Sequence, residues 1–226
     1  MLKALINLSK FLGEYENFKA LLKNHGIKWI TTDSSFNSFL RIINNNHSNL
    51  GQWYSKAMET FRDNEKLWLR FNLLTGLRKE ESVNSFNLII RLNAEGKLNE
   101  YFNEELGILE HFKHGGMFLR NTKNVYISTV TKELVQQIAN SQPVSYPSIR
   151  KRLNKHKQIL RVKELRSYYA TFQRKSGILS EYVDLIQGRI PKSVFARHYL
   201  KIEDLKELVT QVLAVTAKIE ESLLKQ

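Results

Sequence analysis

Apolar residues recur at intervals of three and four positions along most of the chain, the spacing that places them on one face of a helix. Only three prolines interrupt the pattern. The sequence therefore predicts a mostly helical chain. The predicted helices cover Leu2–Leu12, Glu14–Lys23, Ser35–Asn45, Leu50–Phe61, Asn64–Leu74, Lys79–Phe86, Lys97–Phe112, Lys132–Ala139, Tyr146–His156, Lys163–Arg174 and Ser180–Gln187.

One part of the chain has the character of strands instead. Gly115–Gly116 breaks the helical pattern, and two short runs of strand-forming residues follow, Met117–Arg120 and Val125–Val130. The polar turn Asn121–Asn124 lies between them, which predicts a β-hairpin. The expected fold class is mainly α with a small β-hairpin sheet (α+β).

The last part of the chain, from Asp204 to Leu224, has a strongly amphipathic pattern. Its apolar residues share one helical face: Leu205, Leu208, Val209, Val212, Val215, Ile219 and Leu223. Such a face must pack against another apolar surface, and the core of the same chain is one candidate.

A polar run at Asn44–Asn49 favours helix poorly and is the best candidate for a linker. We place the domain boundary there, which gives a helical stub at residues 1–49 and a larger domain at residues 50–226, with the amphipathic tail at 201–226.

Composition narrows the class of protein. The chain has no cysteine, which excludes disulfides, a thiolate nucleophile, iron–sulfur clusters and cysteine-type zinc sites. It has no long uninterrupted apolar run and no signal-peptide pattern. We therefore expect a cytoplasmic protein that neither spans a membrane nor is secreted.

The net charge of +13 is concentrated in one region. Residues 147–175 hold ten basic side chains against Glu164 alone, whereas residues 201–226 carry a slight negative excess. Such a block is either a solvated face or a nucleic-acid surface. Interleaved aromatics at Tyr168, Tyr169 and Phe172 are expected to pack in the core and leave the cations outward. The candidate DNA-phosphate contacts are Arg150, Lys151, Arg152, Lys155, Lys157, Arg161, Arg174 and Lys175.

No nucleotide-binding, metalloprotease or serine-hydrolase motif occurs, and the six histidines show no metal-site spacing. What remains is an ordered set of basic residues and a tyrosine. In sequence order these are Arg78 after Gly76–Leu77 with Glu81 three residues later, Lys123 in the predicted turn, Lys163 and Arg166, Arg189 after Gly188, and Tyr199. Each residue alone has an ordinary explanation, such as a helix-start arginine or a solvated lysine.

Taken in this order, residues 50–199 resemble the tyrosine recombinase (integrase) family, and most closely the integrases of archaeal mobile elements and spindle-shaped viruses. Lys163 stands where the wider family more often has histidine, and Arg189 where it has histidine or tryptophan. The resemblance implies that Tyr199 is the nucleophile and that residues 1–49 correspond to the end of a DNA-clamping domain. A stub of this length cannot encircle a duplex. We therefore expect the chain to be either a minimal integrase or a piece of a longer one.

The chemistry gives each residue type a role. Attack on a DNA phosphodiester builds charge on the non-bridging oxygens, which the guanidiniums of Arg78 and Arg166 can bind, with Arg189 as a further donor. Lys123 is the expected general acid, and Glu81 orients a guanidinium. Because a phosphotyrosine intermediate conserves the bond energy, we expect neither a metal nor another cofactor.

The resemblance implies double-stranded DNA as the partner, an intracellular, nucleoid-associated location, and a homo-tetramer on DNA in which the tail docks on a neighbouring protomer. Two other functions fit the basic surface. One is a non-catalytic, architectural DNA-binding protein, and the other is a type IB topoisomerase-like enzyme that nicks and closes DNA without exchanging strands.

Overall fold

The structure is a computed structural model of the 226-residue chain, and it describes residues 2–27, 49–120, 123–159, 161–190 and 205–225. Contacts divide the chain into two compact units, residues 1–46 and 47–226. The first unit contains α1 (Leu2–Phe11) and α2 (Tyr15–Asn24), which pack against each other. The predicted helix Ser35–Asn45 lies outside the described residues.

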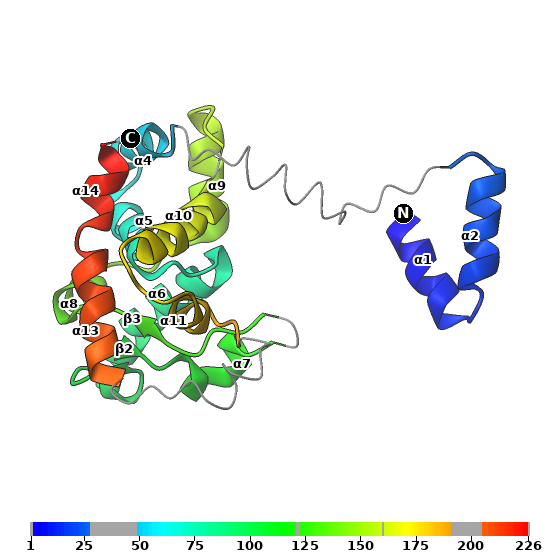
Figure 1. Cartoon of the computed structure of the whole chain (residues 1–226). Helices are drawn as coiled ribbons and strands as arrows, with labels where there is room; N and C mark the ends of the chain where they lie inside the picture. Colours follow the sequence, from blue (N-terminus) through cyan, green and yellow to red (C-terminus); the bar gives the residue numbers. More distant parts are fainter. Residues whose placement is uncertain (1, 28–48, 121–122, 160, 191–204, 226) are drawn as a thin grey trace. The chain divides into compact units, whose positions relative to one another are not determined.

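The second unit is a helical core, and its described helices are shown in Figure 1. Helix α5 packs against α10 and α6, and α6 packs against α8. The bounds are α4 (Leu50–Thr60), α5 (Asp63–Thr75), α6 (Lys79–Ala94), α7 (Gly115–Phe118), α8 (Lys132–Ala139), α9 (Tyr146–Lys155), α10 (Val162–Lys175), α11 (Ser180–Ile186), α13 (Leu205–Thr216) and α14 (Ile219–Leu224). Two 3₁₀ turns, η1 (Leu98–Glu100) and η2 (His111–His114), accompany them.

A small sheet completes the unit. Three antiparallel strands lie in the order β1 (Phe102–Asn103), β2 (Ile108–Leu109) and β3 (Ser128–Thr129). Phe102 pairs with Leu109, and Leu109 pairs with Ser128. The predicted fold class, mainly α with a small sheet, is therefore confirmed.

The prediction of one helix over Lys97–Phe112 is wrong. That stretch forms η1, β1, β2 and the start of η2. Its apolar residues do have helical spacing, but Gly107 adopts a left-handed φ of +68° in the turn between β1 and β2. A left-handed residue ends a helix, and here it lets Phe102 and Leu109 reach the core from two short strands.

The prediction of a hairpin between Met117–Arg120 and Val125–Val130 is also wrong. Residues 115–118 form the short helix α7, and β3 pairs with β2 instead. The ring of Phe118 is buried and lies 4.6 Å from the His111 ring, between centroids. Lys123 therefore lies between α7 and β3 and not on a two-stranded hairpin. We call residues 119–120 and 123–127 the Lys123 segment.

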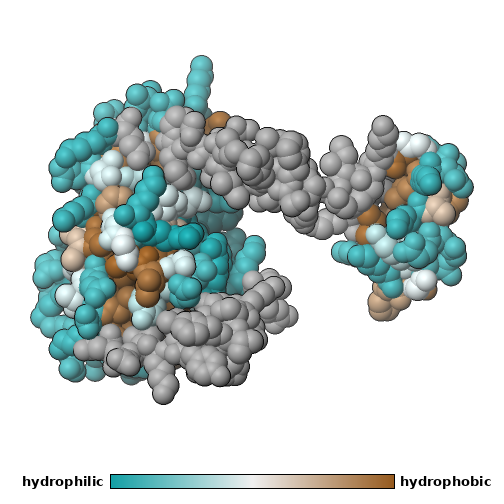
Figure 2. All heavy atoms as spheres, in the orientation of Figure 1, coloured by the Kyte–Doolittle hydropathy of each residue, from teal (hydrophilic) through white to brown (hydrophobic). Residues whose placement is uncertain are grey.

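The amphipathic tail packs on its own chain. Leu208 and Val212 of α13 join Ile178, Val183 and Ile186 in a second apolar cluster, while Ile219 and Leu223 of α14 enter the main core. Figure 1 shows both helices along one side of the unit, and Figure 2 shows apolar side chains gathered beside α13. The structure thus has the tail packed in cis, one of the two placements expected from the sequence.

A buried histidine joins the sheet to α6. The Nδ1 of His111 lies 2.7 Å from the hydroxyl of Tyr101, and its Nε2 lies 2.8 Å from the hydroxyl of Ser128. Tyr101 also donates to Ser85 at 2.8 Å. Burial lowers the pKa of His111 to about 3, so this side chain is neutral at physiological pH.

His111 should make stability depend on pH. In the unfolded chain its pKa returns to about 6.5, so between about pH 6.5 and 3 the unfolded state binds a proton that the folded state does not. The free energy of unfolding should fall by about 2 kcal/mol from pH 7 to pH 5 through this group. Urea unfolding at both pH values measures the change. His111→Gln should remove most of it, whereas substitution of the exposed His156 by Gln should not.

Candidate active site

The turn between α5 and α6 places Arg78. Helix α5 ends at Gly76, whose φ is +62° and where an added Cβ would overlap the ring of Tyr169, so only glycine fits. The side-chain amide of Asn72 donates to the carbonyl of Leu77 at 3.0 Å and holds the turn. Arg78 is the N-cap residue of α6.

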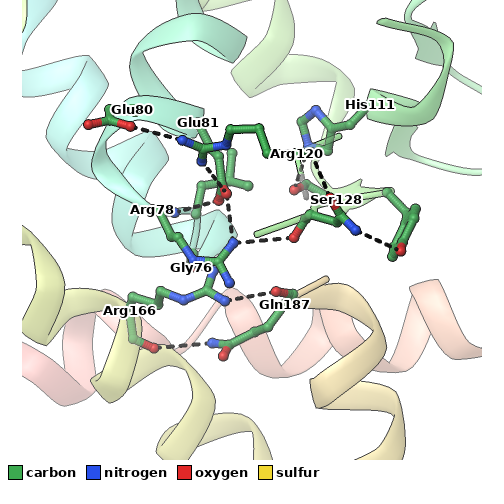
Figure 3. Close-up of polar contacts among 12 residues, drawn as sticks. Gly76, Arg78, Glu80, Glu81, His111, Arg120, Ser128, Arg166 and Gln187 are labelled. Carbon is green, nitrogen blue, oxygen red and sulfur yellow. Dashed lines mark hydrogen bonds and ion pairs between the residues drawn. The ribbon is translucent and has the colours of Figure 1, made fainter. Parts of the chain in front are cut away.

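Arg166 reaches this turn from α10. Its side chain is only 8% exposed. Its Nη1 donates to the carbonyl of Gly76 at 2.7 Å and its Nη2 to the carbonyl of Gln187 at 2.8 Å (Figure 3). The amide of Gln187 donates in return to the carbonyl of Arg166 at 3.3 Å. The hydrogen bonds of this guanidinium therefore fix its position without neutralising its charge.

The environment of Arg166 is strongly positive. Burial is the main cause that lowers the pKa of Arg166 to about 10, together with the charges of Arg78 and Arg189 and against the opposing charge of Glu81. The group remains protonated at neutral pH, but its charge is poorly solvated. An anion beside Arg166 would relieve this cost, which is the electrostatic character of a phosphate-binding site.

Glu81 lies behind Arg78 and is 1% exposed. Its Oε1 accepts from Nη1 of Arg78 at 2.6 Å and from Nη2 of Arg120 at 3.2 Å. Its Oε2 accepts from the backbone N–H of Arg78 at 3.1 Å, as in a capping box. A buried carboxylate with these three donors positions guanidiniums.

The Lys123 segment closes over the same site. Nη1 of Arg78 donates to the carbonyl of Asn124 at 3.2 Å. Gly188, with φ of +70°, contacts the same backbone so closely that an added Cβ would overlap the Asn124 carbonyl oxygen. These contacts bring together residues from α6, the Lys123 segment and the end of α11.

The remaining predicted residues lie at different distances from this centre. Arg189 directly follows Gly188, is exposed, and its Nη1 donates to Asp184 at 3.1 Å. Lys123 is exposed beside Asn124, and Lys163 is exposed on α10, one turn before Arg166. The structure thus brings Arg78, Arg166, Glu81 and the Lys123 segment together. Tyr199 lies outside the described residues.

Tyrosines near Arg166 are part of the core, as the sequence predicted. Tyr168 and Tyr169 are buried, and Phe172 packs against the same cluster. Burial raises the pKa of Tyr168 and of Tyr169, which disfavours the phenolate that a nucleophile needs. Tyr182 packs against the second apolar cluster.

The proposed phosphate contacts of the basic block fall into two groups, those paired with carboxylates of the chain and those exposed to solvent. Arg152 donates from Nε to the buried Glu65 at 2.7 Å, and Arg161 forms an ion pair with Glu164. The other six proposed phosphate contacts are exposed on or beside α9 and α10: Arg150, Lys151, Lys155, Lys157, Arg174 and Lys175.

The sequence missed three contributors to the site. Arg120 was assigned only to a strand, although its position three residues before Lys123 could have drawn attention to it. Gln187 and Asn124 hold arginines through their backbone carbonyls, which leave no signal in a sequence. In the part of the chain that the structure describes, no cluster of three or more histidine or acidic residues could hold a metal ion.

These features define a helical domain with a buried, cationic centre. The family model of archaeal phage integrases matches residues 98–213, just over half of the chain. The chain belongs to this family, which indicates an integrase-type recombinase that acts on DNA. Comparisons with curated proteins and with solved structures gave no match. Among the described helices, none is long and apolar enough to cross a membrane.

Proposed function

We propose that this protein is a tyrosine-type site-specific recombinase that integrates or excises a mobile element. The observation that carries the proposal is the pairing of Arg78 and Arg166 around the turn at Gly76. The two arginines are 88 positions apart in the sequence, and each is held by a carbonyl or by the buried Glu81. Two fixed guanidiniums match the two non-bridging oxygens of a phosphodiester.

In the proposed reaction the Tyr199 hydroxyl gives its proton to a solvent water molecule and attacks the scissile phosphorus. A bond forms between phosphorus and the tyrosine oxygen, and the bond to the 5′-oxygen of the next nucleotide breaks. Lys123 gives a proton to that leaving oxygen. Arg78 and Arg166 stabilise the charge on the non-bridging oxygens, and Arg189 adds a further donor. The products are a 3′-phosphotyrosine and a free 5′-hydroxyl, and attack by another 5′-hydroxyl reverses the step.

The location of Lys163 is consistent with a role beside Arg166 in the reaction. It lies one turn from Arg166 on the exposed side of α10, near the proposed position of DNA. We further propose that residues 1–49 act as the end of a DNA-clamping domain, and that recombination takes place in a tetramer on DNA.

A covalent adduct tests the proposed function. The protein is incubated in EDTA with randomised duplexes nicked at staggered positions, so that short leaving strands diffuse away. A tyrosine recombinase should trap DNA that stays attached to protein on a denaturing gel, and the trapped strands identify the cleaved sequence. Binding without an adduct would indicate an architectural protein instead. Adduct formation with supercoil relaxation but without strand exchange would indicate a topoisomerase.

The two groups of basic residues should respond differently to substitution. Lys151→Ala should leave thermal stability unchanged and lower the slope of log affinity against log salt by about 0.9, the value for one lost phosphate contact. Arg152→Ala should instead lower the free energy of unfolding by on the order of 3 kcal/mol, because it leaves the buried Glu65 without its guanidinium. Binding titrations between about 50 and 200 mM salt, together with urea unfolding, measure both. Equal effects of the two variants on stability would contradict the division of the basic block into exposed residues and residues paired with carboxylates.

A further inference from the structure

Arg120 lies near the site, but the proposed reaction gives it no role. Its side chain is 39% exposed, and both of its terminal nitrogens are engaged. Nη1 donates to Glu80 at 3.0 Å and Nη2 to Glu81 at 3.2 Å. Figure 3 shows this guanidinium beside Arg78, on the side away from Arg166. Because its donors point to carboxylates, Arg120 has no evident part in holding a phosphate.

Hydrogen bonds join the residues before Lys123, including Arg120, to the residues that follow it. The N–H of Arg120 donates to the side-chain oxygen of Asn124 at 2.7 Å, and the N–H of Val125 donates to the carbonyl of Phe118 at 3.2 Å. The side-chain amide of Asn124 also reaches the hydroxyl of Tyr126 at 3.3 Å. These bonds join the two sides of the segment next to Lys123.

The same segment is anchored at two further points. Asn124 gives its carbonyl to Arg78, and its backbone lies against Gly188. Arg120 supplies the third anchor, through two carboxylates at the start of α6. Glu81 therefore joins Arg78 to Arg120 through a single oxygen, and this links the phosphate-binding centre to the segment that carries Lys123.

We propose that Arg120 is a positioning residue for Lys123. By bridging the Lys123 segment to Glu80 and Glu81, it holds the lysine over the Arg78–Arg166 pair, and it acts on cleavage only through proton delivery to the leaving oxygen. This inference rests on the proposed function and assigns to that reaction a residue beyond those expected from the sequence.

The test compares two substrates built on the duplex that the wild-type protein traps. One is ordinary DNA, and the other has sulfur in place of the leaving 5′-oxygen. A thiolate leaves without a proton, so a defect in proton delivery disappears on the sulfur substrate. Arg120→Gln should slow adduct formation at least 10-fold on ordinary DNA and less than about 3-fold on the sulfur substrate, as Lys123→Ala should. Arg78→Ala should be slow on both.

Two controls separate positioning from a structural role. Arg91→Gln removes an exposed α6 arginine that pairs with Glu95, and it should leave both rates unchanged. Arg120→Lys keeps one charged contact to the acidic pair and should recover part of the rate on ordinary DNA. Equal slowing of Arg120→Gln on both substrates, or no slowing on either, would overturn the proposal.

A second measurement does not depend on catalysis. Amide hydrogen exchange in peptides covering residues 118–128 should be faster in Arg120→Gln than in wild type, and unchanged in Arg91→Gln. Unchanged exchange in Arg120→Gln would overturn the anchoring role even if cleavage is slowed. If wild-type protein forms no adduct on either substrate, the proposed function falls, and the exchange experiment still decides whether Arg120 anchors the segment.

Discussion

Tyr199→Phe is expected to abolish the covalent adduct and recombination while DNA affinity stays within a few fold. The substitution removes one hydroxyl and no charge, so it leaves unchanged the basic surface of α9 and α10 that we propose binds phosphates. Gel shifts measure binding, and denaturing gels with trapped DNA measure the adduct.

The matched control is Tyr182→Phe, which removes a hydroxyl from the same region of the sequence. Tyr182 packs against the second apolar cluster, and this variant should form adduct at the wild-type rate. Adduct formation by Tyr199→Phe would mean that the nucleophile is another residue.

Arg166→Lys should slow cleavage by on the order of 10²-fold or more, the usual effect of losing one donor to a developing oxyanion. A lysine keeps the positive charge but lacks the planar fork that reaches the carbonyls of Gly76 and Gln187 together. Because the charge is kept, the salt dependence of DNA binding should not change. Single-turnover cleavage at saturating DNA measures the rate.

Arg91→Lys is the control for this second variant, since it makes the same chemical change on an exposed helix surface. Thermal unfolding of Arg166→Lys checks that the domain still folds at the assay temperature. A rate within 3-fold of wild type, in folded protein, would contradict the assignment of Arg166 to transition-state stabilisation.

Helices with complete local signals were predictable from the sequence. The α8 range, Lys132–Ala139, agrees with the prediction at both ends. Thr131 accepts a hydrogen bond from the N–H of Leu134 at 3.3 Å as its N-cap. The buried residues Leu134, Val135 and Ile138 share one helical face. In such a segment, local propensity and burial favour the same structure.

The sheet could not be predicted because its pairing is decided by distant residues. Val125–Val130 has the composition of a strand, but only Ser128 and Thr129 enter the ladder, and their partner is β2. The expected partner, Met117–Arg120, instead begins in α7, where Phe118 is buried against Tyr101 and His111. Core packing of one aromatic side chain outweighed a weak local pattern.

The site was partly visible in the sequence. Gly76 and Arg78 form a recognisable helix stop and start, and Arg166 lies within the basic block of residues 147–175. The contact between Arg120 and Glu81 joins residues 39 positions apart, and Arg166 is held by two backbone carbonyls. Contacts of these kinds depend on the tertiary arrangement and produce no recognisable pattern of residue spacing in the sequence.

Peptide mapping of the trapped protein–DNA adduct tests the central claim most directly. After protease and nuclease digestion, mass spectrometry should find the nucleotide remnant on Tyr199, attached through a 3′-phosphate. A remnant on Tyr168, Tyr169 or Tyr182, or on a residue other than tyrosine, would contradict the proposed mechanism.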